Sequence, residues 1–412
     1  MILMNVPASP LTRASPRSFG ALWAARSLAA LGDCILLIGL LAWSYRVQES
    51  ATVVGILVTA QLLPPFLLKS AAMRLVGGAR IMPAALVSQL LQGIALLPLL
   101  TVKSDDALPL VLVVALLAAI PSPFLQASQQ AQLRALMRGD RLAAAEQAFA
   151  NTRLITLIVG PAAGTAFYLV SGLGGTAVAA LVAFLVSLGL LVVAGPPPAS
   201  ENSAAPSPSA SPAALQRGLI YTLRYPPLRT VAVLRLLTAL VVGGLLVAQV
   251  AFTVWGIFMG SEYVGLILAG QGLGMAGGSV ARRPIDSRFP PGARVATSLG
   301  LVASAGFAFT LSSSITFAVP FAAAMGFGFG LLIHSLDSLA AIHSPERLRS
   351  SVSAGLGMAT EAAVLLSAIA MGPLTDLLTP RLAITLASVI LSVLALYAFG
   401  AVADRAPSEA RP

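Results

Sequence analysis

The sequence predicts an all-α membrane protein with 12 transmembrane helices in two six-helix bundles. Of its 412 residues, 57% are hydrophobic and only 10% are charged, whereas soluble domains carry roughly 25% charged residues. The apolar runs are continuous over about 20 residues or more, the length that a helix needs to cross a bilayer. A polar stretch, GPPPASENSAAPSPSASPAAL at 195–215, separates six such runs from six more.

Helices are favoured over a β-barrel. In hydrocarbon every backbone N–H and C=O must be paired within the protein, and barrel strands alternate polar and apolar residues over about ten positions. The apolar runs here show no such alternation. The predicted helices are Phe19–Tyr45, Thr52–Leu75, Ile81–Val102, Leu108–Leu125, Leu142–Val170, Gly174–Ala194, Leu228–Met259, Tyr263–Val280, Val295–Ser313, Ile315–Ile342, Ser350–Leu377 and Ala383–Val402.

The polar stretch predicts a linker, because a segment this rich in Ala, Ser and Pro cannot bury a core. The predicted organisation is an N-terminal cytoplasmic tail at 1–18, bundles at 19–194 and 228–402, a cytoplasmic linker at 195–227 and a C-terminal tail at 403–412. The first 18 residues lack the apolar core of a signal peptide. The single cysteine, Cys34, lies in the first apolar run. We expect its side chain to be buried and to pack as a small hydrophobic group.

The distribution of basic residues predicts the orientation. With the N-terminus inside, 19 Lys and Arg residues fall in inner loops and tails, and 3 fall in outer loops, namely Arg46, Lys103 and Arg381. Cytoplasmic loops carry such an excess, so both termini are expected in the cytoplasm. The net charge of +10 does not indicate nucleic-acid binding, because the basic residues lie in short loops without interleaved aromatics.

Three segments resemble the major facilitator superfamily, in its drug:proton antiporter branch of macrolide and siderophore exporters. LWAARSLAALGDCILLIGLLAW, which contains Asp33, resembles that branch's first helix. FANTRLITLIVGPAAGTAF resembles its fifth helix, with Asn151, Gly160-Pro161 and Gly164 similar to the antiporter motif. SPERLRSSVSAGLG, with Arg347 and Arg349, resembles the loop that enters the eleventh helix. The resemblance implies the major facilitator fold, secondary transport and a place in the bacterial inner membrane.

The loop between the second and third helices departs from that family. It reads KSAAMRLVGGARIMPA and carries Lys69, Arg74 and Arg80 but no acid, whereas the family has Gly-x-x-x-Asp-Arg there. The family's gate contact is therefore not expected in the first half. The corresponding loop of the second half, ARRPIDSRFPPGAR, keeps Asp286 among four arginines, so that half is expected to carry more of the gate.

Four titratable residues are candidates for proton coupling. Ionisable groups inside a bilayer cost about 2.5–3.5 kcal/mol and mark function. Asp33 and Glu361 fall near the middle of the first and eleventh helices. Asp337 follows His334 by three residues on one helix face, which suits either a proton relay or a gate contact with an arginine. A carboxyl that only joins helices together is the alternative for Asp33.

Three arginines lie well inside the predicted helices, away from their ends. Arg26 lies two turns before Asp33, about 10 Å along the helix, and is expected to find its partner on another helix. Arg153 and Arg235 are expected to extend toward the lipid headgroups. Together with Arg26, several amide and aromatic residues are candidates for lining a substrate cavity, or alternatively for helix-to-helix hydrogen bonds. They are Gln61, Gln126, Gln249, Phe252, Trp255 and Gln271.

Two sets of glycines follow the small-xxx-small spacing that lets helices approach closely. With Pro161, which bends the fifth helix, they are expected to seal that helix against the eighth, where the two halves of the resembling family meet. Static packing is the alternative. The glycines are Gly160 and Gly164 in the fifth helix, and Gly270, Gly274 and Gly278 in the eighth.

The sequence contains no nucleotide-binding loop, metal cluster or nucleophile elbow, so we expect neither an enzyme nor a bound cofactor or metal. We predict proton-coupled efflux of amphiphilic small molecules by rocking of the two bundles. The expected partners are the lipid bilayer, the substrate and protons, and the chain is expected to be a monomer. A metabolite importer or facilitator is the alternative within transport, and a membrane scaffold or sensor is the alternative outside it.

Overall fold

The computed structural model describes residues 16–76, 80–102, 104–137, 139–196, 212–286 and 288–403. All regular elements within these ranges are helices, and eleven of them are long and apolar enough to span a membrane. One candidate span, Arg141–Ala194, contains 54 residues. A straight helix of that length would be about 80 Å long, far more than the hydrocarbon core of about 30 Å.

This long helix, α6 (Asp140–Ala194), is two spans joined at Gly172, whose φ of 61° and ψ of −153° are not helical. Its glycine contacts with α1 (Pro16–Gln48) show that the chain reverses there. The facing pairs are Gly160 with Cys34, Gly164 with Ile38, Thr176 with Gly39 and Phe184 with Gly32. The first arm therefore runs parallel to α1 and the second runs antiparallel to it, which gives twelve spans within the described ranges.

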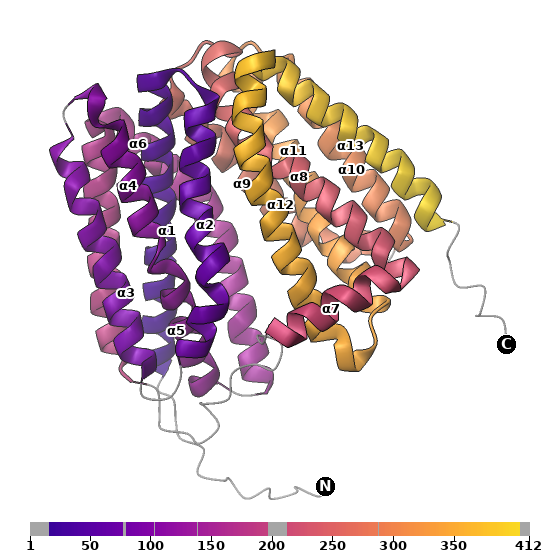
Figure 1. Cartoon of the computed structure of the whole chain (residues 1–412), viewed down its shortest axis with the longest axis horizontal. Helices are drawn as coiled ribbons and strands as arrows, with labels where there is room; N and C mark the ends of the chain where they lie inside the picture. The colour runs from indigo at the N-terminus through magenta and orange to yellow at the C-terminus, as the bar shows by residue number, and fades with distance from the viewer. Residues whose placement is uncertain are drawn as a thin grey trace, which may run out of the picture.

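The spans form two six-helix bundles, shown side by side in Figure 1 from indigo to magenta and from pink to yellow. The first bundle contains α1, α2 (Ala51–Leu75), α3 (Ile81–Leu96), α4 (Leu108–Ala119) continued by α5 (Ser122–Leu136), and both arms of α6, with short 3₁₀ turns at Leu97–Thr101 and Asp105–Ala107. The second contains α8 (Pro226–Trp255), α9 (Val264–Asp286), α10 (Pro291–Thr310), α11 (Ile315–Ile342), α12 (Arg349–Leu378) and α13 (Pro380–Ala403), with 3₁₀ turns at Ser261–Tyr263 and Glu346–Leu348.

The predicted fourth helix was too short. Its expected end was Leu125, but α5 continues the same span to Leu136 after a bend at Pro121. The polar residues that suggest a loop, such as Gln129 and Gln132, are instead buried inside the bundle. A polar residue is compatible with a membrane helix when it faces the bundle interior rather than lipid.

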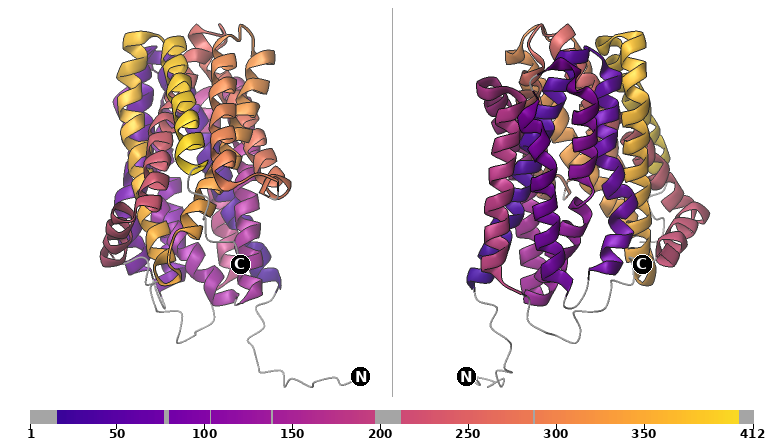
Figure 2. Two further views of the ribbon diagram at one scale, coloured as in Figure 1. Left: turned by 90° about the vertical axis from the view of Figure 1, so that its right-hand side faces the viewer. Right: turned by 60° about the vertical axis from the view of Figure 1, so that its left-hand side comes forward.

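A second difference concerns the predicted linker at 195–227. It contains an amphipathic helix, α7 (Pro212–Arg224), which packs against α12 so closely that a Cβ at Gly218 would lie 2.1 Å from the Ser351 carbonyl oxygen. Figure 2 shows α7 projecting from the bundles near the ends of their helices. The rest of the linker at 197–211 and the tails at 1–15 and 404–412 lie outside the described residues.

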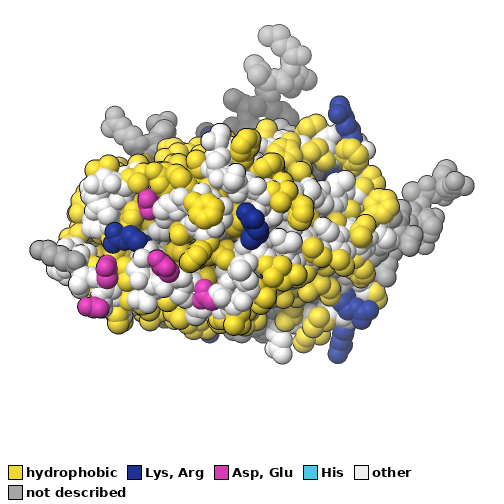
Figure 3. Space-filling view, turned by 90° about the horizontal axis from the view of Figure 1, so that it is seen from above, with side chains coloured by type: hydrophobic (Ala, Val, Ile, Leu, Met, Phe, Trp, Pro, Cys, Tyr) yellow, Lys and Arg dark blue, Asp and Glu magenta, His cyan; other side chains and the backbone are white. Residues whose placement is uncertain are grey.

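The two ends of the molecule differ in charge. We call the end where α1 begins and α13 ends the termini side, and the other end the opposite side. Among the described residues, the exposed charges on the opposite side include more acids than bases, and Figure 3 shows acidic side chains gathered on one part of it. These acids are Glu49, Asp105, Asp106 and Asp376, and these bases are Arg46 and Arg381. On the termini side the exposed charges include Arg74, Arg134, Arg141, Arg224, Arg229, Arg347 and Arg349.

Candidate functional site

A cavity of about 480 Å³ lies between the bundles, lined by α1 and α6 of the first and by α8, α9, α11 and α12 of the second. Leu37, Leu245 and Phe329 are among its mainly apolar lining. The polar side chains that line it are few: Arg235, Thr238, Gln249, Gln271 and Thr360. A largely apolar wall with a few polar groups is typical of small-molecule sites, which occupy about 300–1,000 Å³. We call it the central cavity.

Arg235 joins three helices at the wall of this cavity. Its guanidinium forms an ion pair with Asp337 of α11, and its Nε donates a hydrogen bond to the Thr360 hydroxyl of α12 at 2.9 Å. The expectation that Arg235 extends to the headgroups is therefore wrong. Asp337 is already paired with this arginine, and His334 lies half-buried one turn earlier.

A second cavity of about 300 Å³, the vestibule, lies between α2, α5, α6 and α12. It shares Thr360 and Val364 with the central cavity, so the two adjoin. At its wall the Lys69 ammonium of α2 forms an ion pair with Glu361 of α12 at 2.5 Å. Glu361, expected as a titrating carboxylate, is thus ion-paired with the other bundle.

Asp33 and Arg26 follow the inner face of α1 toward the termini side. Asp33 lies one turn before Leu37, which lines the central cavity, and its side chain is accessible. The Arg26 guanidinium lies 4.8 Å from the centre of the Phe149 ring of α6. Its Nη1 is buried with no hydrogen-bond partner in the described part of the chain. Arg153, which carries the same charge, follows Phe149 by four residues on the same face of α6.

On the opposite side, Asp376 of α12 joins the bundles. Its carboxylate accepts hydrogen bonds from the backbone N–H of Ala51 at 2.7 Å and of Thr52 at 2.9 Å. It also accepts from the hydroxyls of Ser50 at 2.8 Å and Thr52 at 2.6 Å. These donors belong to the first turn of α2, where N–H groups have no partner within the helix. The carboxylate of one bundle therefore caps a helix of the other.

Two more contacts between the bundles lie on this side. Ser261, between α8 and α9, donates to the Ala42 carbonyl of α1 at 2.6 Å. Thr165 of α6 donates to the Glu262 carbonyl at 2.8 Å. With the Asp376 contacts, they close the opposite side of the interface.

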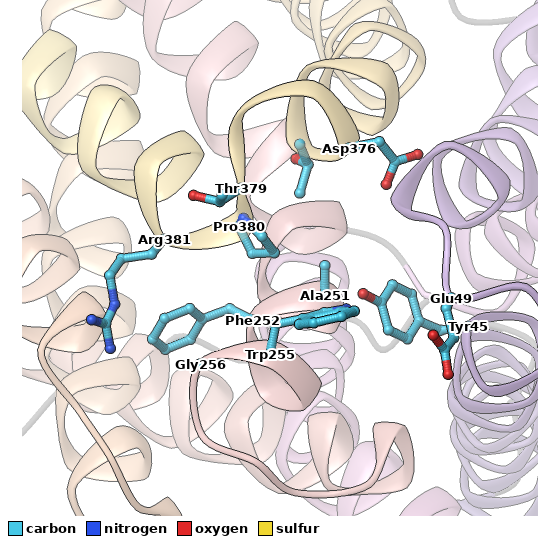
Figure 4. A pocket seen from close by; sticks show the side chains of 11 residues that line it. Tyr45, Glu49, Ala251, Phe252, Trp255, Gly256, Asp376, Thr379, Pro380 and Arg381 are labelled. Atoms are coloured by element: carbon cyan, nitrogen blue, oxygen red, sulfur yellow. The ribbon is translucent and has the colours of Figure 1, made fainter.

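A shallow pocket of about 380 Å³ lies outside this closure, and Figure 4 shows Tyr45 of α1 facing Trp255 of α8 within it. Phe252 and Trp255 line this pocket rather than the central cavity. Both residues are candidates for lining a substrate cavity, and in α8 they follow Gln249, which lines the central cavity, by three and six positions.

The predicted glycine seal uses different glycines. Gly160 and Gly164 pack against α1. Within the second bundle, the glycines Gly270, Gly274 and Gly278 pack against α11. The fifth and eighth spans do meet, but through Gly265 and Gly272: a Cβ there would lie 2.4 Å from the carbonyl oxygens of Pro161 and Leu157 respectively. Sequence spacing identifies glycines that allow close packing, but not the helix that packs on them.

The other predicted residues lie apart. Gln249 and Gln271 line the central cavity and Gln126 lines the vestibule, while Gln61 is half-buried in α2. Asn151 is exposed and accepts a hydrogen bond from Gln147. Arg347 and Arg349 are exposed where α12 begins, and Asp286 ends α9 with its side chain outside the described residues.

Sequence reasoning missed the roles of Asp376 and Arg235. Arg235 lies nine residues into α8, about 13 Å from its end, and this depth was an available signal against a headgroup contact. Asp376 gave no such signal, because it lies two residues before the end of a helix, where charges are common, and its partners are over 300 residues away in sequence.

Comparison with known proteins supports the fold. No family model matches the sequence, and no curated protein matches it. A nucleoside transporter, NupG, in a D323A mutant form, matches with a TM-score of 0.74 at 11% identity, covering 93% of this chain and 99% of that one. A POT family transporter in complex with a thioalcohol-conjugated peptide matches with a TM-score of 0.72 at 13% identity, covering 94% and 96%.

A bacterial homologue of the human lysosomal transporter Spinster, in an inward-facing and unoccupied conformation, matches with a TM-score of 0.68 at 16% identity, covering 96% of this chain and 100% of that one. These likenesses extend over nearly the whole of each chain. The two six-helix bundles therefore form the major facilitator fold.

Proposed function

We propose that this chain is a secondary active transporter that exports amphiphilic small molecules in exchange for protons. The central cavity carries the proposal: it lies between two bundles that are joined on the opposite side, and its wall suits an apolar molecule with a polar group. Rocking of the bundles would expose it to each side in turn. One chain contains both bundles and the cavity, which supports a monomer.

The proposed proton sites are Asp33 and Glu361. Protonation of Glu361 removes the charge that holds Lys69, and so weakens the ion pair between the bundles near the vestibule. Asp33, on the inner face of α1, would exchange its proton with the cavity. The basic termini side and the acidic opposite side support cytoplasmic termini in a bacterial inner membrane.

The test measures efflux of a panel of dyes and drugs from cells that lack their own pumps, with and without a proton gradient. Wild-type efflux should stop when the gradient is collapsed, and Asp33→Asn and Glu361→Gln should each lower it about tenfold or more, since one lost proton site uncouples the cycle. Asp105→Asn, which changes an exposed carboxylate within the first bundle, is the matched control.

Efflux that is independent of the gradient would exclude proton coupling. If the proton gradient drives accumulation of a compound in the cells instead of its efflux, the chain is an importer. The fold and the central cavity are equally compatible with that function. Normal efflux by both variants would exclude the two proposed proton sites.

A further inference from the structure

Two arginines near the vestibule have no acidic partner in the described part of the chain. We propose that Arg26 and Arg153 bind the anionic group of the substrate, so that the transported class is organic anions with an apolar body. This inference rests on the proposed transport function and adds the charge of the substrate to it.

Arg26 and Arg153 converge on one place. Arg26 lies over the Phe149 ring, and Arg153 follows Phe149 by four residues, on the same face of α6. The two guanidiniums repel each other, and the described residues supply no carboxylate within 4 Å of either. A buried guanidinium N–H without an acceptor is costly, and the Arg26 Nη1 is such a group. A shared anion would remove both costs.

The charges between the bundles leave room for that anion. Lys69 is paired with Glu361 and Arg235 with Asp337. The remaining charged groups on these faces of α1 and α6 are the two arginines, Asp33 and Glu146, an exposed carboxylate one turn before Phe149 that forms no ion pair within 4 Å with either arginine. A proton on Asp33 therefore leaves this region with a net positive charge. This balance favours an anion and opposes a cation.

The position of Arg153 connects the anion to the apolar cavity. Arg153 lines the vestibule, and Leu157, one turn after it on α6, lines the central cavity. A carboxylate or sulfonate held there would leave the rest of the molecule among Leu37, Leu157 and Val364 of the adjoining cavity. The planar guanidinium matches both oxyanions through paired hydrogen bonds.

The test compares three compounds that share a naphthalene body but differ in charge: 2-naphthoate, 2-naphthalenemethanol and 2-naphthylmethylamine. Their binding to the purified chain in lipid nanodiscs at pH 7 is measured by equilibrium dialysis, with empty nanodiscs subtracted. Wild type should bind the anion about tenfold or more tightly than the alcohol, the usual gain from a charge-assisted contact. It should bind the amine most weakly.

Arg153→Gln and Arg26→Gln should each remove this preference and leave alcohol binding within about twofold. Arg153→Lys should restore part of it, since the charge returns without the paired donors. Arg229→Gln, which removes an exposed arginine at the start of α8, should leave the preference intact. Because Arg153 is exposed and Arg26 is partly buried, the Arg153 variants keep the test valid if Arg26→Gln does not fold.

Three results would overturn the anion site. The wild type could bind naphthoate no more tightly than the alcohol, it could bind none of the three compounds, or Arg153→Gln could keep the preference for naphthoate unchanged. Transport is scored separately, by uptake of the same compounds and of the dye panel into proteoliposomes under a pH gradient. If the amine or the alcohol is moved and naphthoate is not, the anion site fails and transport stands. If naphthoate binds through Arg153 but no compound is moved, transport fails and the site stands.

Discussion

Single side chains join the two bundles, and Asp376 does so with four hydrogen bonds to the other bundle. Its carboxylate faces four donors of the first α2 turn, Ser50 to Thr52. Negative charge at a helix N-terminus contributes about 0.3–1 kcal/mol through the helix dipole, and a hydrogen bond to a charged group contributes about 1.5–3 kcal/mol. The opposite side should therefore open when this charge is removed.

Asp376→Asn should increase the open fraction about tenfold or more, because the loss of one charged hydrogen bond already corresponds to that ratio. The measurement is pulsed electron paramagnetic resonance between spin labels at Ser104→Cys and Arg381→Cys, exposed positions on the opposite side of the two bundles. Asp105→Asn is the control, since the ion pair of Asp105 within the described residues is with Arg46 of its own bundle, at 3.9 Å. An unchanged distance distribution in Asp376→Asn would contradict the capping role.

At the same scale, sequence reasoning located charges more reliably than their partners. It predicted that Asp33 faces the bundle interior, because a charge facing lipid is too costly, and this stays a prediction: Asp33 lies one turn before the cavity residue Leu37 but lines none of the three cavities described above. The partners of Glu361 and Arg235 depend on which helices become neighbours. One sequence without homologues does not contain that information.

At the scale of helices, the contact between α6 and α9 depends on the absence of side chains. Pro161 has no N–H, so the Leu157 carbonyl lacks its helical donor, and Gly272 lies directly against that carbonyl. A methyl group at Gly272 would lie 2.4 Å from its oxygen, and a backbone atom cannot move aside as a flexible side chain can.

Gly272→Ala should therefore destabilise the protein by about 1–3 kcal/mol, the usual cost of overpacking. Gly300→Ala in α10 is the matched control, because a Cβ there meets nothing within 4 Å and alanine favours a helix over glycine by about 0.5–1 kcal/mol. Thermal unfolding in one detergent should give a lower midpoint for Gly272→Ala and an equal or higher one for Gly300→Ala. The reverse order would exclude close packing at Gly272.

The predicted and observed helices agree except where polar residues lie in helices. Continuous apolar runs located the spans because only a helix satisfies its own backbone in lipid. The end of α5 and the whole of α7 were missed because both are rich in polar residues. The glutamines of α5 are buried in the bundle interior, and α7 packs against α12 in a range predicted as linker.

At the scale of the whole molecule, the contacts on the opposite side and the cavities toward the termini side belong to one conformation. If the bundles rock as rigid bodies, opening one side closes the other, because both respond to a single equilibrium. A variant that opens the opposite side must then shield the vestibule by a similar factor.

This reciprocity can be measured with single cysteines in a Cys34→Ser background. Thr375→Cys reports on the opposite side, since Thr375 is buried and lines the pocket there, and Gln130→Cys reports on the vestibule, which that exposed residue lines. Adding Asp376→Asn should raise the maleimide labelling rate at 375 and lower the rate at 130 by comparable factors. Ser104→Cys, exposed on the opposite side and outside both spaces, should not change. A rise at 375 with no fall at 130 would mean that the two sides open independently, which would contradict rocking and leave Asp376 as a local contact.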